Sequence, residues 1–173
     1  YTSDTIPPAA PLITDSTPPS PTDVTTTPLL LGEAEGDALV RVYTNDECSG
    51  DAEFQASASG LGLFQVEVSV MPNSTGSFWA DAVDLAGNVS PCSSVPFLFI
   101  HDDIAPTYPI LLGTDPDTPG NTNTPKVFGT AEPGTDVVLY LKNDCTGVTV
   151  GSGGTDANGN FSVGSILPAE SKT

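Results

Sequence analysis

The clearest structural signal in the sequence is Phe64-Gln65-Val66-Glu67-Val68-Ser69-Val70, in which apolar and polar residues alternate strictly. Side chains of a β-strand point alternately to its two faces, so this pattern predicts a half-buried strand over 64–70. Similar short runs, separated by turn residues, predict further strands at about 11–14, 28–34, 40–43, 52–58, 78–83 and 94–100. We find no segment with helical periodicity.

This strand pattern predicts an all-β fold. Seven short strands within roughly 98 residues are typical of an immunoglobulin-like β-sandwich, in which two sheets bury their alternating faces against each other. The Cys…Trp…Cys spacing of antibody domains is absent, because Trp79 falls on the strand 78–83 and not on 40–43.

The chain also repeats itself. Segments 27–66 and 124–163 share 12 identities over 40 positions at an offset of 97 residues, about five times the number that chance pairing gives. The identities include Gly-x-Ala-Glu at 32–35 and 129–132, and Cys48 with Cys145. At an offset of 98 residues, Asp4 and Pro8 pair with Asp102 and Pro106.

The repeat predicts tandem immunoglobulin-like β-sandwiches, the second one incomplete. Residues 1–4 are then the tail of a preceding repeat, 5–102 a complete repeat and 103–173 a partial one. The partial repeat has no counterparts of residues 77–99, which form the last two strands, F and G, of the predicted sandwich. We therefore expect the chain to be a segment of a longer tandem array.

Composition removes several classes of function. The 173 residues include 22 acids, 4 bases and 1 histidine, for a formal net charge of −18. Nucleic acid and anionic membrane surfaces both require basic patches, so we expect no nucleic-acid partner. No run approaches 18 apolar residues, so we expect no membrane insertion in this segment. Three cysteines without a Cys-x-x-Cys pair argue against a zinc site.

Four motifs together resemble bacterial immunoglobulin-like (Big) repeats. They are Asp-x-x-x-Pro at each repeat start, Gly-x-Ala-Glu, Cys-x-Gly, and Asp84-Leu85-Ala86-Gly87-Asn88-Val89-Ser90 after the strand 78–83. Such repeats form the stalks of very large secreted adhesins and other surface proteins. The resemblance covers essentially the whole chain, and it implies a secreted protein on the bacterial cell surface.

Acidic residues gather where a sandwich of this topology brings several loops to the end at which the chain enters. Hard cations bind several oxygen ligands, and clustered carboxylates otherwise repel each other. The resemblance also implies calcium at repeat junctions, where it would stiffen the joint. The candidate calcium ligands are Asp4, Glu35, Asp84, Asp102, Asp103 and Glu132. The alternative is a coat of solvated acids.

Cys48 and Cys92 are predicted to form a disulfide. An acidic, Thr- and Pro-rich chain suits an oxidising exterior, and closing a loop of about 45 residues stabilises the fold by roughly 4 kcal/mol. Cys48 is expected at the far end of the sandwich from the turn that precedes Cys92. A long excursion of the chain must therefore bring the two together. Cys145 aligns with Cys48, and its own partner would lie beyond Thr173.

Catalysis has little support in the sequence, so we expect no enzyme. A nucleophile needs a neighbouring base, and the single histidine, His101, lies between the repeats, where we expect a solvated junction residue. The Asp156–Asn160 stretch matches the start of an EF-hand loop. Phe161 stands where such a loop needs glycine, which favours a simple turn.

Tyr43 and Trp79 point outward by strand alternation and are candidates for ligand contact. The leading hypothesis is a non-enzymatic structural and adhesive module, a rod-like stalk segment whose partners are neighbouring repeats and an unknown host receptor or glycan. One alternative is a filament or sheath subunit that assembles with other copies by intermolecular strand pairing. Another is a carbohydrate-binding module that uses the two aromatics.

Overall fold

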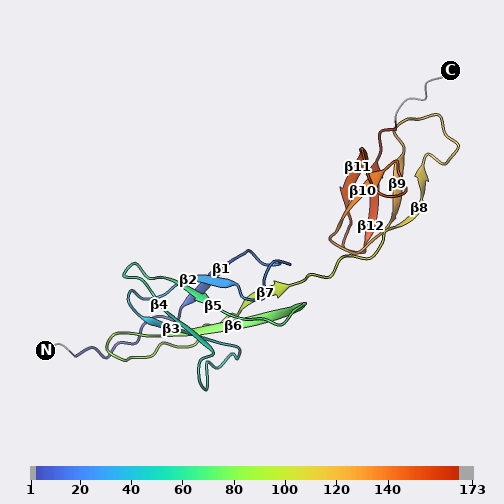
Figure 1. Ribbon diagram of the computed structural model, residues 1–173. Helices are drawn as coiled ribbons and strands as arrows, with labels where there is room; N and C mark the ends of the chain where they lie inside the picture. The colour runs from blue at the N-terminus through green and yellow to red at the C-terminus, as the bar shows by residue number, and fades with distance from the viewer. Residues whose placement is uncertain (1–2, 168–173) are drawn as a thin grey trace. The chain divides into compact units, whose positions relative to one another are not determined.

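The computed structural model describes residues 3–167 and is built from β-strands and loops in two compact units (Figure 1). Unit 1 covers Tyr1–Ile104 and unit 2 covers Ala105–Thr173. The boundary lies two residues after the one drawn from the sequence repeat. Within 3–167 there is no helix long and apolar enough to cross a membrane. The predicted all-β class is confirmed.

Unit 1 contains two antiparallel sheets. The smaller has the order β1-β2-β5, and the larger has the order β4-β3-β6-β7. The strands are β1 (Leu12–Thr17), β2 (Leu29–Glu33), β3 (Leu39–Tyr43), β4 (Phe54–Ser57), β5 (Leu63–Glu67), β6 (Ser74–Val83) and β7 (Phe97–His101). Single backbone bonds from Val68 to Pro28 and from Val70 to Thr26 continue the pairing of the predicted strand 64–70 beyond β5.

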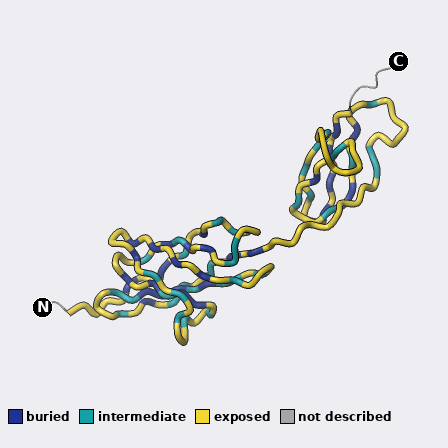
Figure 2. Tube along the Cα trace, viewed as in Figure 1, coloured by how far each residue is buried: buried dark blue, intermediate teal, exposed yellow. Residues whose placement is uncertain are grey.

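Both sheets of unit 1 contribute to one core. Leu30, Phe64 and Val66 come from the smaller sheet, and each is at most 3% exposed. The larger sheet supplies the other buried residues of the strands, Val40, Val42, Phe78, Ala80 and Phe99. The inward positions follow the predicted alternation of strands 40–43 and 78–83. Figure 2 shows buried residues recurring along these strands.

The long strand β6 changes partner halfway along one edge. Its first half, Ser74–Phe78, pairs with β7. Along its second half the returning segment 89–93 replaces β7, since the N–H of Ser90 bonds to Ala82 O and that of Ser93 to Ala80 O. On the far side of β7, Thr22 forms a parallel bridge to His101. The chain therefore covers parts of two sheet edges with irregular segments.

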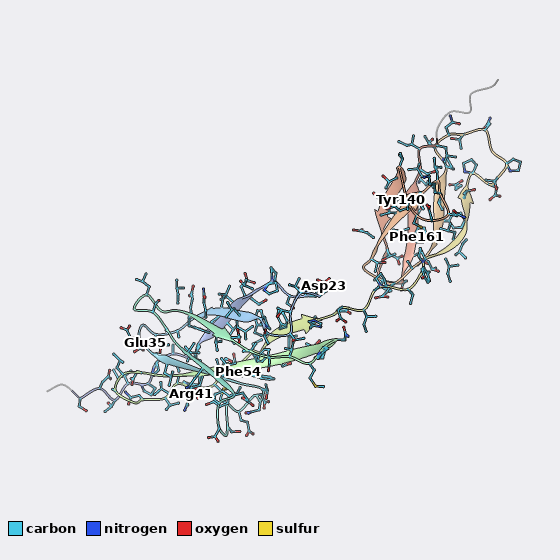
Figure 3. The ribbon with its side chains drawn as sticks, in the orientation of Figure 1. Asp23, Glu35, Arg41, Phe54, Tyr140 and Phe161 are labelled. Carbon is cyan, nitrogen blue, oxygen red and sulfur yellow. A yellow bond between two sulfur atoms is a disulfide. The ribbon has the colours of Figure 1, made fainter. Side chains whose placement is uncertain are left out.

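Unit 2 has a three-stranded sheet, β12-β9-β8, and a two-stranded sheet, β10-β11. The strands are β8 (Ile110–Asp115), β9 (Lys126–Thr130), β10 (Asp136–Tyr140), β11 (Thr149–Gly154) and β12 (Asn160–Gly164). Its core is small, with Val137, Phe161 and Val163 as its buried members (Phe161 is labelled in Figure 3). Many apolar side chains of this unit remain exposed, among them Ile110, Leu111, Leu112, Leu141, Val148 and Ile166.

Strand positions recur between the units. β2, β3 and β5 reappear 97 residues later as β9, β10 and β12, and β1 reappears 98 residues later as β8. The offset of 98 residues also relates the irregularities in strand register of β1 and β8, which fall after Ile13 and Leu111. The two offsets are those of the sequence repeat.

The glycine of the Gly-x-Ala-Glu motif has a packing reason that is the same in both units. A Cβ on Gly32 would collide with the carbonyl oxygen of Leu12 and the ring of Phe64. A Cβ on Gly129 would meet the equivalent atoms, Ile110 O and the Phe161 ring. The backbone of the second strand therefore approaches its neighbours too closely for any side chain.

Candidate functional site

Three of the predicted calcium ligands line one hollow at the end of unit 1, which we call the acid-lined hollow. Asp4 precedes β1, Glu35 follows β2 and Asp84 follows β6 (Glu35 is labelled in Figure 3). The hollow has a volume of about 530 Å³. Its lining is completed by Ser3, Gly36, Leu85 and Ala86. The sequence thus correctly placed these three acids at one end of the unit.

Asp84 uses its carboxylate to hold its own turn. Oδ1 accepts the N–H groups of Ala86 and Asn88, both at 2.8 Å, and Oδ2 accepts the Asn88 side-chain amide at 2.7 Å. These bonds, led by the one from the Asn88 side chain, lower the pKa of Asp84 below its usual value. Gly87 in the same turn has a φ of 91°, which favours glycine. Asp84 therefore has a structural role in the turn.

The six candidate ligands do not form one metal centre in the part of the chain that the structure describes. No three acidic, histidine or cysteine side chains of residues 3–167 are grouped so that they could hold a metal ion. Asp102 and Asp103 follow β7, beside Asn73 at the other end of β6, where Asn73 Oδ1 accepts the Asp103 N–H at 2.8 Å. Glu132 belongs to unit 2. Calcium binding stays a prediction.

The Asp156–Asn160 stretch forms the same kind of turn as Asp84–Asn88. Asp156 Oδ1 accepts the N–H groups of Asn158 and Asn160, both at 2.8 Å. The N–H of Asp156 bonds back to Asn160 O at 2.8 Å. Bonds from Asn160 lower the pKa of Asp156, as those from Asn88 do in the first turn. The carboxylate closes the turn between β11 and β12, in agreement with the simple turn favoured by the sequence.

The predicted disulfide between Cys48 and Cys92 is present, with a Cα–Cα distance of 5.5 Å. The segment 89–93, which returns along β6, is the excursion that joins the two ends of the sandwich. It carries Cys92 back from the Asp84 turn toward the loop after β3, where Cys48 lies. Cys145, the equivalent of Cys48, is exposed and free.

A charged cluster on the outer face of β3 and β6 has no counterpart among the sequence predictions. Arg41 donates two hydrogen bonds to Asp81, Nε to Oδ1 at 2.8 Å and Nη2 to Oδ2 at 2.6 Å. The bond to Asp81 raises the pKa of Arg41. The two residues are direct cross-strand partners. The alternation of apolar and polar residues in strands 40–43 and 78–83 places Arg41 and Asp81 on the outer face. Two opposite charges on the same face were therefore the signal from which this ion pair could have been predicted.

The prediction that Tyr43 is exposed is wrong, because only 1% of it is accessible. The cross-strand partner of Tyr43 is Trp79. The Arg41 guanidinium lies 5.9 Å from the centre of the Tyr43 ring. Burial, with a contribution from the Asp81 charge, raises the pKa of the Tyr43 phenol. Trp79 is half-buried. Of the two aromatic residues that the sequence suggested for ligand contact, Tyr43 and Trp79, only Trp79 is therefore accessible on the outer face.

His101 is also buried, at 4% exposure, whereas the sequence suggested a solvated junction residue. It is the last residue of β7, and its Nδ1 accepts the backbone N–H of Asn73 at 3.2 Å. Its backbone pairs with Thr22 on the other side. These neighbours enclose the imidazole, which helps to hold the turn before β6.

Comparison with known proteins gives little beyond this. No family model matches the chain, and no curated protein matches it. A solved structure titled "Biofilm associated protein - BSP domain" is similar, with 14% sequence identity and a TM-score of 0.33. The alignment covers 93% of this chain and 25% of that one, so the chain spans about a quarter of its length. A likeness of this size carries no argument about function.

Proposed function

We propose that this chain is a non-enzymatic spacer, a rod-like stalk segment of a large bacterial cell-surface protein made of tandem immunoglobulin-like sandwiches. Such a segment would hold a distal binding region away from the cell. One observation carries the proposal: four strands recur after 97 or 98 residues, together with the irregularity that follows Ile13 and Leu111. A strand arrangement that recurs at a fixed interval in the sequence is typical of tandem-repeat proteins.

Two further properties support an extracellular spacer. The Cys48–Cys92 disulfide suits an oxidising compartment, where such bonds persist. The net charge of −18 opposes association between like units. Neighbouring repeats of the same polypeptide would be the first partners of the chain. Calcium at the acid-lined hollow would add stiffness, and this part is tested separately below.

The spacer role can be tested by displaying the chain on cells between a membrane anchor and a reporter binding domain. One and two copies of the chain are compared with none, and capture of beads that carry the reporter's ligand is measured. A spacer raises capture with copy number, and Trp79→Ala leaves that capture unchanged. Bead capture that does not change with the number of copies contradicts the spacer role. Binding of beads without reporter ligand, lost in Trp79→Ala, would instead support a carbohydrate or protein contact.

Assembly into a filament or sheath is the second candidate, because β10 has an edge without a partner among the described strands. Exposed strand edges are templates for pairing with other chains. Sedimentation of the purified chain over a wide concentration range separates the candidates. Concentration-dependent polymers support a filament subunit, and a monomer at millimolar concentration supports the spacer.

A further inference from the structure

The outer face of the sheet β1-β2-β5 in unit 1 carries large apolar side chains that are exposed. Leu12 is 62% exposed, Leu63 57% and Leu29 36%, and Leu31 at the centre of the face is half-buried. A contiguous exposed apolar patch is typical of a surface that binds a partner. Directly opposite residues share a face, so the register gives the three rows of what we call the β1-β2-β5 outer face: Leu12, Glu33 and Leu63; Asp15, Leu31 and Gln65; Thr17, Leu29 and Glu67.

A groove lies within the first two rows, and we call it the Leu31 groove. Its volume is about 320 Å³, and Leu31, Leu63 and Phe64 supply its apolar lining. Thr14 also lines it. This residue falls in the register shift of β1, and its Oγ1 donates a hydrogen bond to Leu31 O at 3.3 Å. The irregularity of β1 thus helps to shape a concave apolar seat in the sheet face.

Three acids lie among these leucines, and no base lies on the face. Asp15, Glu33 and Glu67 are exposed, and each stands directly opposite a leucine. Arg41 is the only lysine or arginine among residues 1–104, and it is bound to Asp81 on the other sheet. Within residues 3–167 this is the only ion pair. The three carboxylates of the outer face therefore have no cation of unit 1 to balance them.

Unit 2 has the same sheet face without this charge. At the offsets of 97 and 98 residues, the three acids are replaced by Gly113, Thr130 and Gly164. The one acid of that face, Asp115, stands directly opposite Lys126. The same strand arrangement therefore forms with neutral residues at all three positions. The acids of unit 1 are not needed to build the sheet, and they leave its outer face with a charge that unit 2 does not have.

The apolar and acidic positions define a diagonal across the face. Neighbouring strands are about 4.8 Å apart, and residues on one face of a strand are about 6.8 Å apart. The diagonal from Leu63 through Leu31 to the third row of β1 is therefore about 17 Å long. Asp15 and Glu33 lie on one side of it and Glu67 on the other. Because an α-helix rises 1.5 Å per residue, about 11 helical residues span the diagonal.

We propose that the β1-β2-β5 outer face binds a cationic amphipathic helix of a partner protein. The apolar stripe of the helix lies along the diagonal and places one large side chain in the Leu31 groove. Lysine or arginine residues on both flanks of the stripe reach the three acids. Apolar burial supplies affinity, and the matching charges select the partner. This interaction goes beyond the spacer role and does not depend on it.

Charge excludes the other occupants of this face. A second copy of the chain that used the same face would bring three further acids against the first three. The equivalent face of unit 2 offers no attraction, because Asp115 and Lys126 cancel each other. Nucleic acid and anionic membranes carry the same sign of charge as the face. A cationic polypeptide remains as the occupant that matches both its charge and its leucines.

The test uses the full chain and a fluorescent synthetic peptide of about 14 residues, long enough to span the diagonal. The peptide has leucines at helical spacing around one central tryptophan, with lysines on both flanks of this stripe. A matched peptide keeps every lysine and has glutamine at each apolar position. Fluorescence anisotropy is measured at about 0.15 M salt, where distant charges are screened. We expect the amphipathic peptide to bind at least about tenfold more tightly than the glutamine peptide.

Two charge variants of the chain separate this face from the general acidity of the protein. The first neutralises the face, in the variant Asp15→Asn/Glu33→Gln/Glu67→Gln. The second removes the same charge from the exposed loop after β3, in the variant Asp46→Asn/Glu47→Gln/Asp51→Asn. We expect the first to weaken binding about tenfold, as three exposed ion pairs of ordinary strength do together, and the second to weaken it less than twofold.

The apolar part of the proposal is tested with Leu63→Gln, which should also weaken binding about tenfold while circular dichroism and the urea midpoint stay unchanged. Equal weakening by the two charge variants would show attraction to net charge alone and overturn the proposal. Equal binding of the two peptides, or no anisotropy change up to about 1 mM chain, would overturn it as well. Self-association of the chain that the neutral-face variant abolishes would show a second copy as the occupant instead.

Discussion

Under mechanical load, the Cys48–Cys92 disulfide should shorten the extension that unit 1 releases when it unfolds. The bond spans a sequence separation of 44 residues and holds the two Cα atoms 5.5 Å apart. Because an extended chain spans about 3.5 Å per residue, reduction should free about 44 × 3.5 Å less 5.5 Å, or about 150 Å. A spacer that carries tension would keep this length in reserve.

The assay is optical-tweezers unfolding of the full chain through handles at both termini, with and without a reducing agent. The longer of the two unfolding steps should grow by about 150 Å on reduction. A Cys48→Ser/Cys92→Ser variant should show the long step in both conditions, and Cys145→Ser should change neither. Equal steps in oxidised and reduced protein, or a gain confined to the shorter step, would refute the reasoning.

Four further predictions concern stability and ions. Arg41→Met should lower the free energy of unfolding by about 3 kcal/mol in urea, because it strands the Asp81 carboxylate at 5% side-chain exposure; the double variant with Asp81→Leu should recover most of the loss, and equal losses would count against a buried pair. Gly32→Ala should cost about 1–3 kcal/mol through its collisions with Leu12 and Phe64, and an unchanged urea midpoint would contradict that packing. The pKa of Asp84 is lowered in the folded state, so its contribution is present above the unfolded pKa, about 4, and is lost as pH falls through the folded value; Asp84→Asn should therefore flatten the acid limb of stability against pH, and an unaltered limb would remove this role. If calcium binds the acid-lined hollow, millimolar calcium should raise the melting temperature relative to excess chelator, and Glu35→Gln should abolish the rise; identical curves would leave the acids as a solvated coat.

Much of the fold was predictable, because it rests on short-range patterns. Alternation at 64–70 located β5, and the repeat at 97 residues located its equivalent, β12. Alternation also gave the inward residues of β3 and β6. Alternation could not show where β5 ends, because the alternating pattern runs on to Val70. Beyond the end of the strand, Val68 and Val70 are joined to the neighbouring segment only by single backbone hydrogen bonds.

The site was predictable only in part, because burial on an outer face depends on neighbours that alternation does not reveal. Tyr43 is outward by pattern, yet Arg41 and Trp79 enclose it. The three acids of the acid-lined hollow were placed correctly, but hydrogen bonds within a turn decide what Asp84 does. That role could have been found from Asp-x-x-Gly-Asn, which occurs at both 84–88 and 156–160.

The pairing of Thr22 with the outer side of β7 bears on how a protein made of similar domains avoids misfolding during synthesis. Adjacent domains of like sequence emerge in succession, and their strands can pair with the wrong neighbour before each domain closes. Ser20 Oγ bonds to the Ile100 N–H at 2.8 Å, and Thr22 bonds to the backbone of Ile100 and Asp102. A segment from the start of unit 1 thus covers the outer edge of its last strand, which leaves less of that edge open to pairing with a strand of a neighbouring copy.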